Sequence, residues 1–155
     1  MTDASFKVYS NIPADKMNEA LAVAKLNNLQ LLSFTVTAAQ LAGQAVVSVA
    51  QLLPGQVVVQ ASGVTNDAIT FSGATTVVLG LATTAAGAPA TDLLTAASAT
   101  TFAVNDKFAA GANLAPYVVQ AGTNFLNLRQ GTSRTVSADG SFVINVLVSN
   151  AAVNA

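Results

Sequence analysis

The segment Ser141-Phe142-Val143-Ile144-Asn145-Val146-Leu147-Val148-Ser149 shows most clearly the pattern that governs this 155-residue chain. Its large apolar side chains recur at every second position, at Phe142, Ile144, Val146 and Val148. A period of two is typical of a β-strand with one buried face, because successive side chains point to opposite sides of the sheet. The preceding Asp139-Gly140 favours a tight turn, so we expect a hairpin that pairs this strand with Thr135-Val136.

Shorter versions of this alternation occupy most of the chain after Asn28. Turn residues such as Pro54-Gly55 separate them, and Ser62-Gly63 is read as a further turn. The pattern predicts strands over residues 32–37, 45–53, 56–61, 68–71, 75–83, 102–104, 117–120, 124–129 and 141–149. A series of about eight short strands of this kind predicts an all-β fold, an antiparallel β-sandwich or jelly roll.

The small-residue stretch between the fifth and sixth of these strands is harder to assign. Residues 84–91 are read as a small-residue loop, and the whole stretch 82–103 is expected to be an ordered loop and not a disordered linker, because apolar anchors such as Leu93 and Leu94 lie within it. Residues 92–97 fit two structures equally well. They could form a helical turn capped by Asp92, or they could form a strand.

Residues 1–28 follow a different pattern and are expected to form an arm and a short helix. Pro13 suits the first turn of a helix, and Met17 and Leu21 lie one turn apart on an apolar stripe. The helix would cover one end of the sheet or join a small bundle with other copies. The expected organisation is therefore an N-terminal arm and short helix at 1–28, a β-sandwich domain at 29–150 and a frayed tail at 151–155.

The composition excludes several classes of function. The chain has no Cys and no His, which excludes a cysteine nucleophile, a Ser-His-Asp triad, a histidine metal site and any disulfide. A net charge of −1 gives no basic surface for nucleic acid. The longest apolar run with large side chains, residues 77–82, is far shorter than the roughly 20 residues that a membrane-spanning helix needs.

No pattern of residues predicts catalysis, a metal site or a cofactor. The acids Asp67, Asp92, Asp106 and Asp139 stand at expected turns, and two of them have only one Asn beside them, too few oxygen ligands for calcium. Arg129 and Arg134 flank Gly131, where they could contact an acidic partner or a carbohydrate, or form a solvated rim. We therefore expect a protein that is not an enzyme.

The distribution of charge is the most informative feature for function. Only 8% of the residues are charged, against about 25% in a typical soluble domain. From Leu26 to Thr91 the only charged residue is Asp67. One interpretation is a monomer with a Thr, Ser and Gln surface. The other, which we favour, is a homo-oligomer or larger assembly that buries this surface, because obligate interfaces lack charge. Its interface is expected to include Met17, Leu21, Val57, Val59, Val77 and Leu79.

Three segments carry a resemblance to a known class of protein. They are Val36-Thr37-Ala38-Ala39-Gln40-Leu41, Leu53-Pro54-Gly55-Gln56-Val57-Val58-Val59 and the terminal run from Asp139 to Val148. Their order resembles small β-sandwich virion proteins of tailed bacteriophages over residues 31–149. The Ala- and Thr-rich residues 82–103 depart from that pattern.

The resemblance implies a structural role in a virus particle. Such proteins decorate or cement capsids or form the heads of short fibres, commonly as trimers. It implies a homotrimer on the capsid surface, with the major capsid protein or another virion protein as partner. An alternative is a fibre-tip or adhesin-type β-sandwich that binds host surface glycan through residues 84–91 and 105–115, with Tyr117 contributing an aromatic surface.

Overall fold

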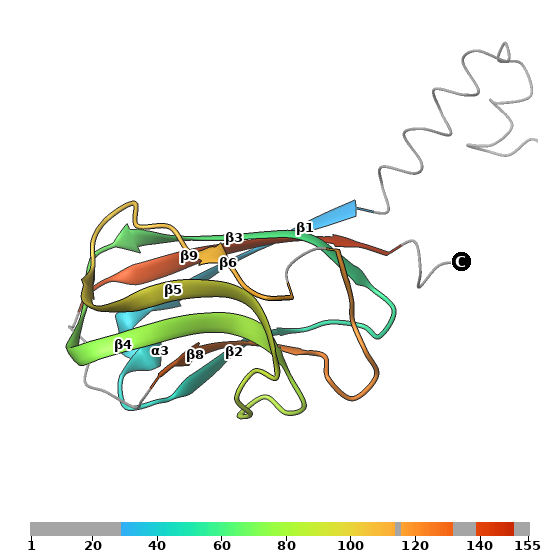
Figure 1. Ribbon diagram of the computed structural model, residues 1–155, viewed down its shortest axis with the longest axis horizontal. Coiled ribbons are helices and arrows are strands. Elements are labelled where there is room, and N and C mark those ends of the chain that lie inside the picture. Colours follow the sequence, from blue (N-terminus) through green and yellow to red (C-terminus); the bar gives the residue numbers. More distant parts are fainter. Residues whose placement is uncertain (1–28, 114–115, 132–138, 151–155) are drawn as a thin grey trace, which may run out of the picture.

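The computed structural model describes residues 29–113, 116–131 and 139–150, which form two packed layers of strands (Figure 1). The strands are β1 (Leu29–Thr37), β2 (Val46–Gln51), β3 (Val57–Asp67), β4 (Ile69–Ala82), β5 (Thr91–Phe102), β6 (Ala109–Ala110), β7 (Tyr117–Val118), β8 (Phe125–Gln130) and β9 (Ser141–Ser149). The short helix α3 (Ala38–Leu41) joins β1 to β2. The helix expected around Met17 and Leu21 and the tail at 151–155 lie outside the described residues.

The strands form two antiparallel sheets whose order is that of a hairpin rolled up on itself. Sheet A has the order β1-β9-β3-β7, and sheet B has the order β2-β8-β4-β5-β6. Early strands pair with late ones from the ends inward: β1 with β9, β2 with β8, β3 with β7 and β4 with β5. This is the strand order of a jelly roll with β6 added at one edge, and it confirms the predicted all-β sandwich.

The core lies between the two sheets and follows from the period-two pattern. The apolar residues of β9 predicted to share one face, Phe142, Ile144, Val146 and Val148, are all completely buried. From sheet B they meet the buried residues Val77, Leu79, Leu81, Leu126 and Leu128. Four phenylalanine rings pack edge to face toward one end: Phe71 on Phe102, Phe102 on Phe142 and Phe108 on Phe142, with centroids 5.7, 5.7 and 5.3 Å apart.

The hairpin predicted at Asp139-Gly140 is wrong, because both edges of β9 are already occupied. Residues 141 to 149 pair with β1 on one side and with β3 on the other. No edge is left for a strand at Thr135-Val136, which lie outside the described residues. Gly140 does make a turn, with a φ of 129°, but it leads the chain into the centre of sheet A.

Several strands are longer than the sequence pattern suggested. β3 continues through Ser62-Gly63 without a turn, because both residues pair with β9. Gly63 serves instead to admit the ring of Phe108, which would lie 2.9 Å from a Cβ at this position. The two strands expected at 68–71 and 75–83 are one strand, β4, whose register against β5 shifts between Thr70 and Thr75. Residues 92–97, left open between helix and strand, belong to β5, so the ordered loop expected over 82–103 is limited to residues 83–90.

The connection between β1 and β2 is fixed by hydrogen bonds at both of its ends. Thr37 caps α3 in a capping box, in which its hydroxyl accepts from the Gln40 N–H and its own N–H donates to Gln40 Oε1 at 2.9 Å. Gln130 of β8 is fully buried and donates through Nε2 to the carbonyls of Leu41 and Gln44. The turn after α3 is therefore tied to sheet B.

Candidate interaction surface

The described residues contain no arrangement of side chains suited to catalysis or metal binding. No group of three or more acidic residues lies close enough to hold a metal ion in this part of the chain. The carboxylate of Asp106 accepts the N–H of Ala103 at 2.7 Å, and that of Asp67 accepts from Ser141 at 3.3 Å, so both serve local structure. None of the described helices is long and apolar enough to cross a membrane.

The outer face of sheet A is almost free of charge. Within β1, β9, β3 and β7 the only charged residue is Asp67, the last residue of β3. The register places Leu29 and Val57 on either side of Ser149 of β9, and Ser33 and Ser62 on either side of Asn145. Leu31 lies beside Leu147. The exposed apolar side chains of this face are Leu29 (39%), Leu31 (65%), Val59 (36%) and Val118 (47%).

The outer face of sheet B is different, because the chain covers part of it. Asn127 in β8 is fully buried and donates through Nδ2 to the carbonyls of Thr84 and Gly87, at 2.9 and 2.8 Å. These bonds hold the loop of residues 83–90 over the sheet, as expected for an ordered loop. The uncovered part carries Arg129, which lies between Val46 and Val78.

The two lateral sides of the sandwich also differ. On one side the edge strands are β6 and β7, each only two residues long, with Asp106-Lys107 shortly before β6 and Pro116 directly before β7. On the other side they are β1, with nine residues, and β2, with six. Natural proteins protect sheet edges with short strands, charges, proline or bulges. Within residues 29–113, 116–131 and 139–150, the second side is protected only by a bulge in β2, between Ser48 and Ala50.

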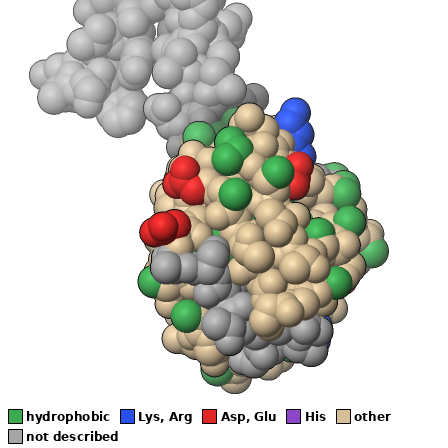
Figure 2. Space-filling model, turned by 90° about the vertical axis from the view of Figure 1, so that its left-hand side faces the viewer, with side chains coloured by type: hydrophobic (Ala, Val, Ile, Leu, Met, Phe, Trp, Pro, Cys, Tyr) green, Lys and Arg blue, Asp and Glu red, His purple; other side chains and the backbone are tan. Residues whose placement is uncertain are grey.

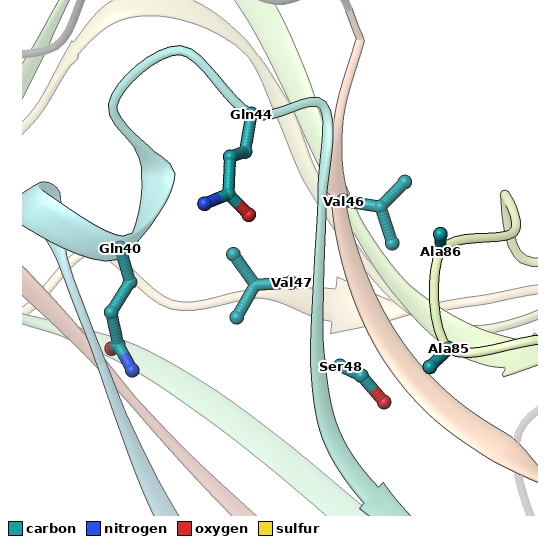
Figure 3. A pocket seen from close by; sticks show the side chains of 7 residues that line it. All are labelled: Gln40, Gln44, Val46, Val47, Ser48, Ala85 and Ala86. Carbon is teal, nitrogen blue, oxygen red and sulfur yellow. The ribbon is translucent and has the colours of Figure 1, made fainter.

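A shallow groove runs along this second side. One part of it, an open hollow of about 410 Å³, lies between α3, β2 and the tip of the 83–90 loop (Figure 3). A second part continues between β1 and β2. The lining contains no charged group and consists of Ser33, Phe34, Thr35, Val36, Gln40, Gln44, Val46, Val47, Ser48, Val49, Ala85 and Ala86.

The charged groups of the described residues gather mainly at one end of the molecule. Asp67 and Asp139 lie at the ends of β3 and β9, where Ser141 pairs with Asp67. Asp106 and Lys107 join them, since Val64 of β3 pairs with Lys107. Figure 2 shows this end, with acidic and basic side chains set among uncharged surface. The apolar residues Leu29, Val57 and Val118 lie at the far end of sheet A.

The interface residues suggested by the sequence fall into three groups. Val57 and Val59 lie on sheet A, where Val58 between them points into the core, so both are available to a partner. Val77 and Leu79 are completely buried between the sheets and are not part of the surface proposed below. Met17 and Leu21 lie outside the described residues. The sequence missed Leu31, the most exposed large apolar residue in the described part of the chain, because the predicted strand began one residue later.

Comparison with known proteins supports the fold. The chain is similar to a chain in the cyanophage Pam1 capsid asymmetric unit, with a TM-score of 0.51 and 19% identity over 79% of this chain and 84% of that one. No family model and no curated protein matches the sequence. At this identity the likeness shows a shared fold, a jelly roll of the kind used in viral capsids and in other proteins.

Proposed function

We propose that this chain is a structural protein of a virus particle, which decorates or cements a capsid as a homo-oligomer, with a trimer as the form that the sequence resemblance implies. The observation that carries the proposal is the uncharged, unprotected surface over sheet A and the β1–β2 side. Its partners would be other copies of the chain and the major capsid protein, at the capsid surface. The fold shared with a chain of a cyanophage capsid supports this assignment.

Association through this surface is favourable on physical grounds. Burial of apolar surface contributes roughly 25 cal/mol per Å², and a stable interface buries about 1,600 Å² in total. The surface also carries Ser33, Gln60, Ser62 and Asn145, whose neutral polar groups lose far less on leaving water than charged groups would. Because few charges are involved, the contact should resist salt.

Mass spectrometry of purified virus particles from the source of this sequence tests the proposal. We expect the chain at a copy number comparable with that of the capsid subunits, retained after a wash in about 1 M salt, where charge–charge contacts are largely screened. Its absence from such particles, or its release as a monomer at low salt, would contradict the proposal.

The alternative of glycan binding has less support. Tyr117 is half-buried and packs against the core, and its hydroxyl lies 3.4 Å from that of Thr91. Its ring is therefore not presented as an open stacking surface. A glycan array probed with the purified chain separates the two functions: specific binding that is kept in Tyr117→Phe and lost in Tyr117→Ala would replace the structural role with recognition.

A further inference from the structure

The free edge of β1 presents a regular row of backbone groups. The N–H of Ala38 points toward β9 and donates to the carbonyl of Gly140, which directly precedes that strand. The N–H of Thr37 points the opposite way, away from β9, and donates to Gln40 Oε1. Backbone direction alternates along an antiparallel pair, so Leu32, Phe34 and Val36 bond to β9. The N–H and C=O groups of Leu31, Ser33 and Thr35 therefore point outward, away from the sheet.

The bonding on the far side of β9 agrees with this assignment. The Gly63 carbonyl accepts from Phe108, and the Thr65 N–H donates to Asp106, so both groups point away from β9. Ser62 and Val64 must then bond to Asn145 and Val143 of β9, their register partners. The alternate residues of β9, including Phe142 and Ile144, are left to bond β1, as the pattern requires.

No other described segment covers this row of groups. The side chain of Gln40 reaches only Thr37, at the end of the strand. Along Ser33 to Val36 the edge borders the groove toward β2. Register against β9 is unbroken over all nine residues, so β1 has no bulge in it, and it has no proline and no charge. A bulge, a proline or a charge in an edge strand normally prevents its pairing with another strand, and β1 has none of the three.

We propose that β1 pairs with β1 of a second copy, antiparallel and around a two-fold axis at Ser33, so that sheet A continues across both subunits. This inference rests on the proposed function and specifies one contact of the assembly. Ser33 would exchange two hydrogen bonds with its counterpart, and Leu31 would do so with Thr35 of the second copy. In a trimer held together by the outer face of sheet A, a pair of this kind would link two trimers.

The sequence of β1 favours a second copy as the occupant. Antiparallel pairing at Ser33 sets Leu32 beside Phe34 of the second copy. Both side chains are only half-buried in the single chain, where no described strand lies beyond this edge. Each would cover the other, adding an apolar cross-strand contact. No like charges meet, since β1 contains none.

Hydrogen exchange followed by nuclear magnetic resonance tests the proposal on the unmodified chain. In the concentrated sample, the amides of Leu31, Ser33 and Thr35 should exchange at least about tenfold more slowly than after dilution, as expected when hydrogen bonds form only in the pair. The amides of Leu32, Phe34 and Val36 should stay protected at both concentrations. Rapid, concentration-independent exchange at Leu31, Ser33 and Thr35 would overturn the proposal.

Two variants then separate edge pairing from docking of the outer face. Ser33→Pro removes an N–H that the single chain does not use, and it should raise the dissociation constant of the pair by roughly tenfold or more through the lost central bonds. Ser62→Lys places a charge in the same row of the face, two strands from the edge, and should leave the pair intact.

Analytical ultracentrifugation of folded variants gives the answer. Loss of association in Ser62→Lys, with none in Ser33→Pro, would assign the contact to the face and overturn edge pairing. If these experiments show that β1 does not pair, that result says nothing about whether the chain is part of the virus particle. Mass spectrometry of the particle therefore tests the proposed function separately. If Ser33→Pro does not fold, the exchange experiment on the unmodified chain stands alone.

Discussion

The two lateral sides of this sandwich solve the problem of exposed strand edges in opposite ways. On the β6–β7 side each edge strand has two residues and is preceded by charges or a proline. On the β1–β2 side the described residues leave uncovered a nine-residue strand without charge, proline or bulge. A chain that protects one side and not the other retains a capacity for pairing where protection is missing.

The two outer faces repeat this contrast. Sheet B is covered in part by the chain's own loop at residues 83–90, held by Asn127, and sheet A has no such cover among the described residues. The difference teaches that low charge alone does not identify an interface. It becomes informative where the chain has also left its backbone edges and apolar side chains uncovered.

The largest loss of stability is expected from a substitution that disrupts packing on the outer face of sheet B, which the 83–90 loop covers in part. A Cβ on Gly80 would lie 2.1 Å from the carbonyl oxygen of Thr91, where β5 begins. Gly80→Ala must therefore displace backbone, and we expect a loss of about 3 kcal/mol or more in the free energy of unfolding. Ser72→Ala, at an exposed position of the same strand, should change it by less than about 0.5 kcal/mol. Chemical denaturation measures both, and equal stability of the two variants would contradict the packing described.

A matched pair of asparagines compares the two faces directly. Asn127 and Asn145 lie in the middle of β8 and β9, and only Asn127 holds a loop. Asn127→Ala should cost about 2 kcal/mol for two lost hydrogen bonds and leave residues 83–90 open to protease. Asn145→Ala should cost less than about 0.5 kcal/mol. Similar losses in the two variants would mean that the outer faces do not differ as described.

A third change concerns the helix at the end of the open edge. Thr37→Ala removes the hydroxyl of the capping box and should lower the free energy of unfolding by about 1 kcal/mol. Thr35→Ala, on the same face of β1 but without a capping role, is the control. Thermal unfolding of both variants measures the difference, and a Thr37→Ala protein as stable as the control would show that the cap contributes nothing.

The sequence predicted the parts of this fold that depend on alternation. Strands β1, β8 and β9 lie close to the positions that the apolar pattern predicted, because one face of each strand is buried and the other is exposed to solvent or polar. The pattern failed where long-range pairing decides the structure. The Asp139-Gly140 turn looks like a hairpin, but β9 receives both neighbours from distant parts of the chain.

The candidate surface was predicted less well than the fold, for a physical reason. Alternation shows that a strand has two faces and does not show which of them meets another layer. Val77 and Leu79 looked equivalent to Val57 and Val59, yet they lie on the inner face of β4, whereas in β3 it is Val58 that points into the core. In β3 a register shift between Val58 and Gln60 accommodates Val59 as an extra residue, and it remains exposed.

The smallest effect on stability is expected from a substitution on the outer face of sheet A. The same substitution gives the sharpest test of whether that face takes part in assembly. Leu31 is 65% exposed, so Leu31→Lys removes little buried area and should change the free energy of unfolding by less than about 0.5 kcal/mol. In an assembly that covers this surface, the same lysine would have to leave water without a partner, which is costly. We therefore expect a chain of unchanged stability whose oligomers dissociate. A Thr70→Lys variant places the charge on the outer face of sheet B and should leave them intact. If sedimentation shows the Leu31→Lys oligomer unchanged, the uncharged surface of sheet A serves no assembly.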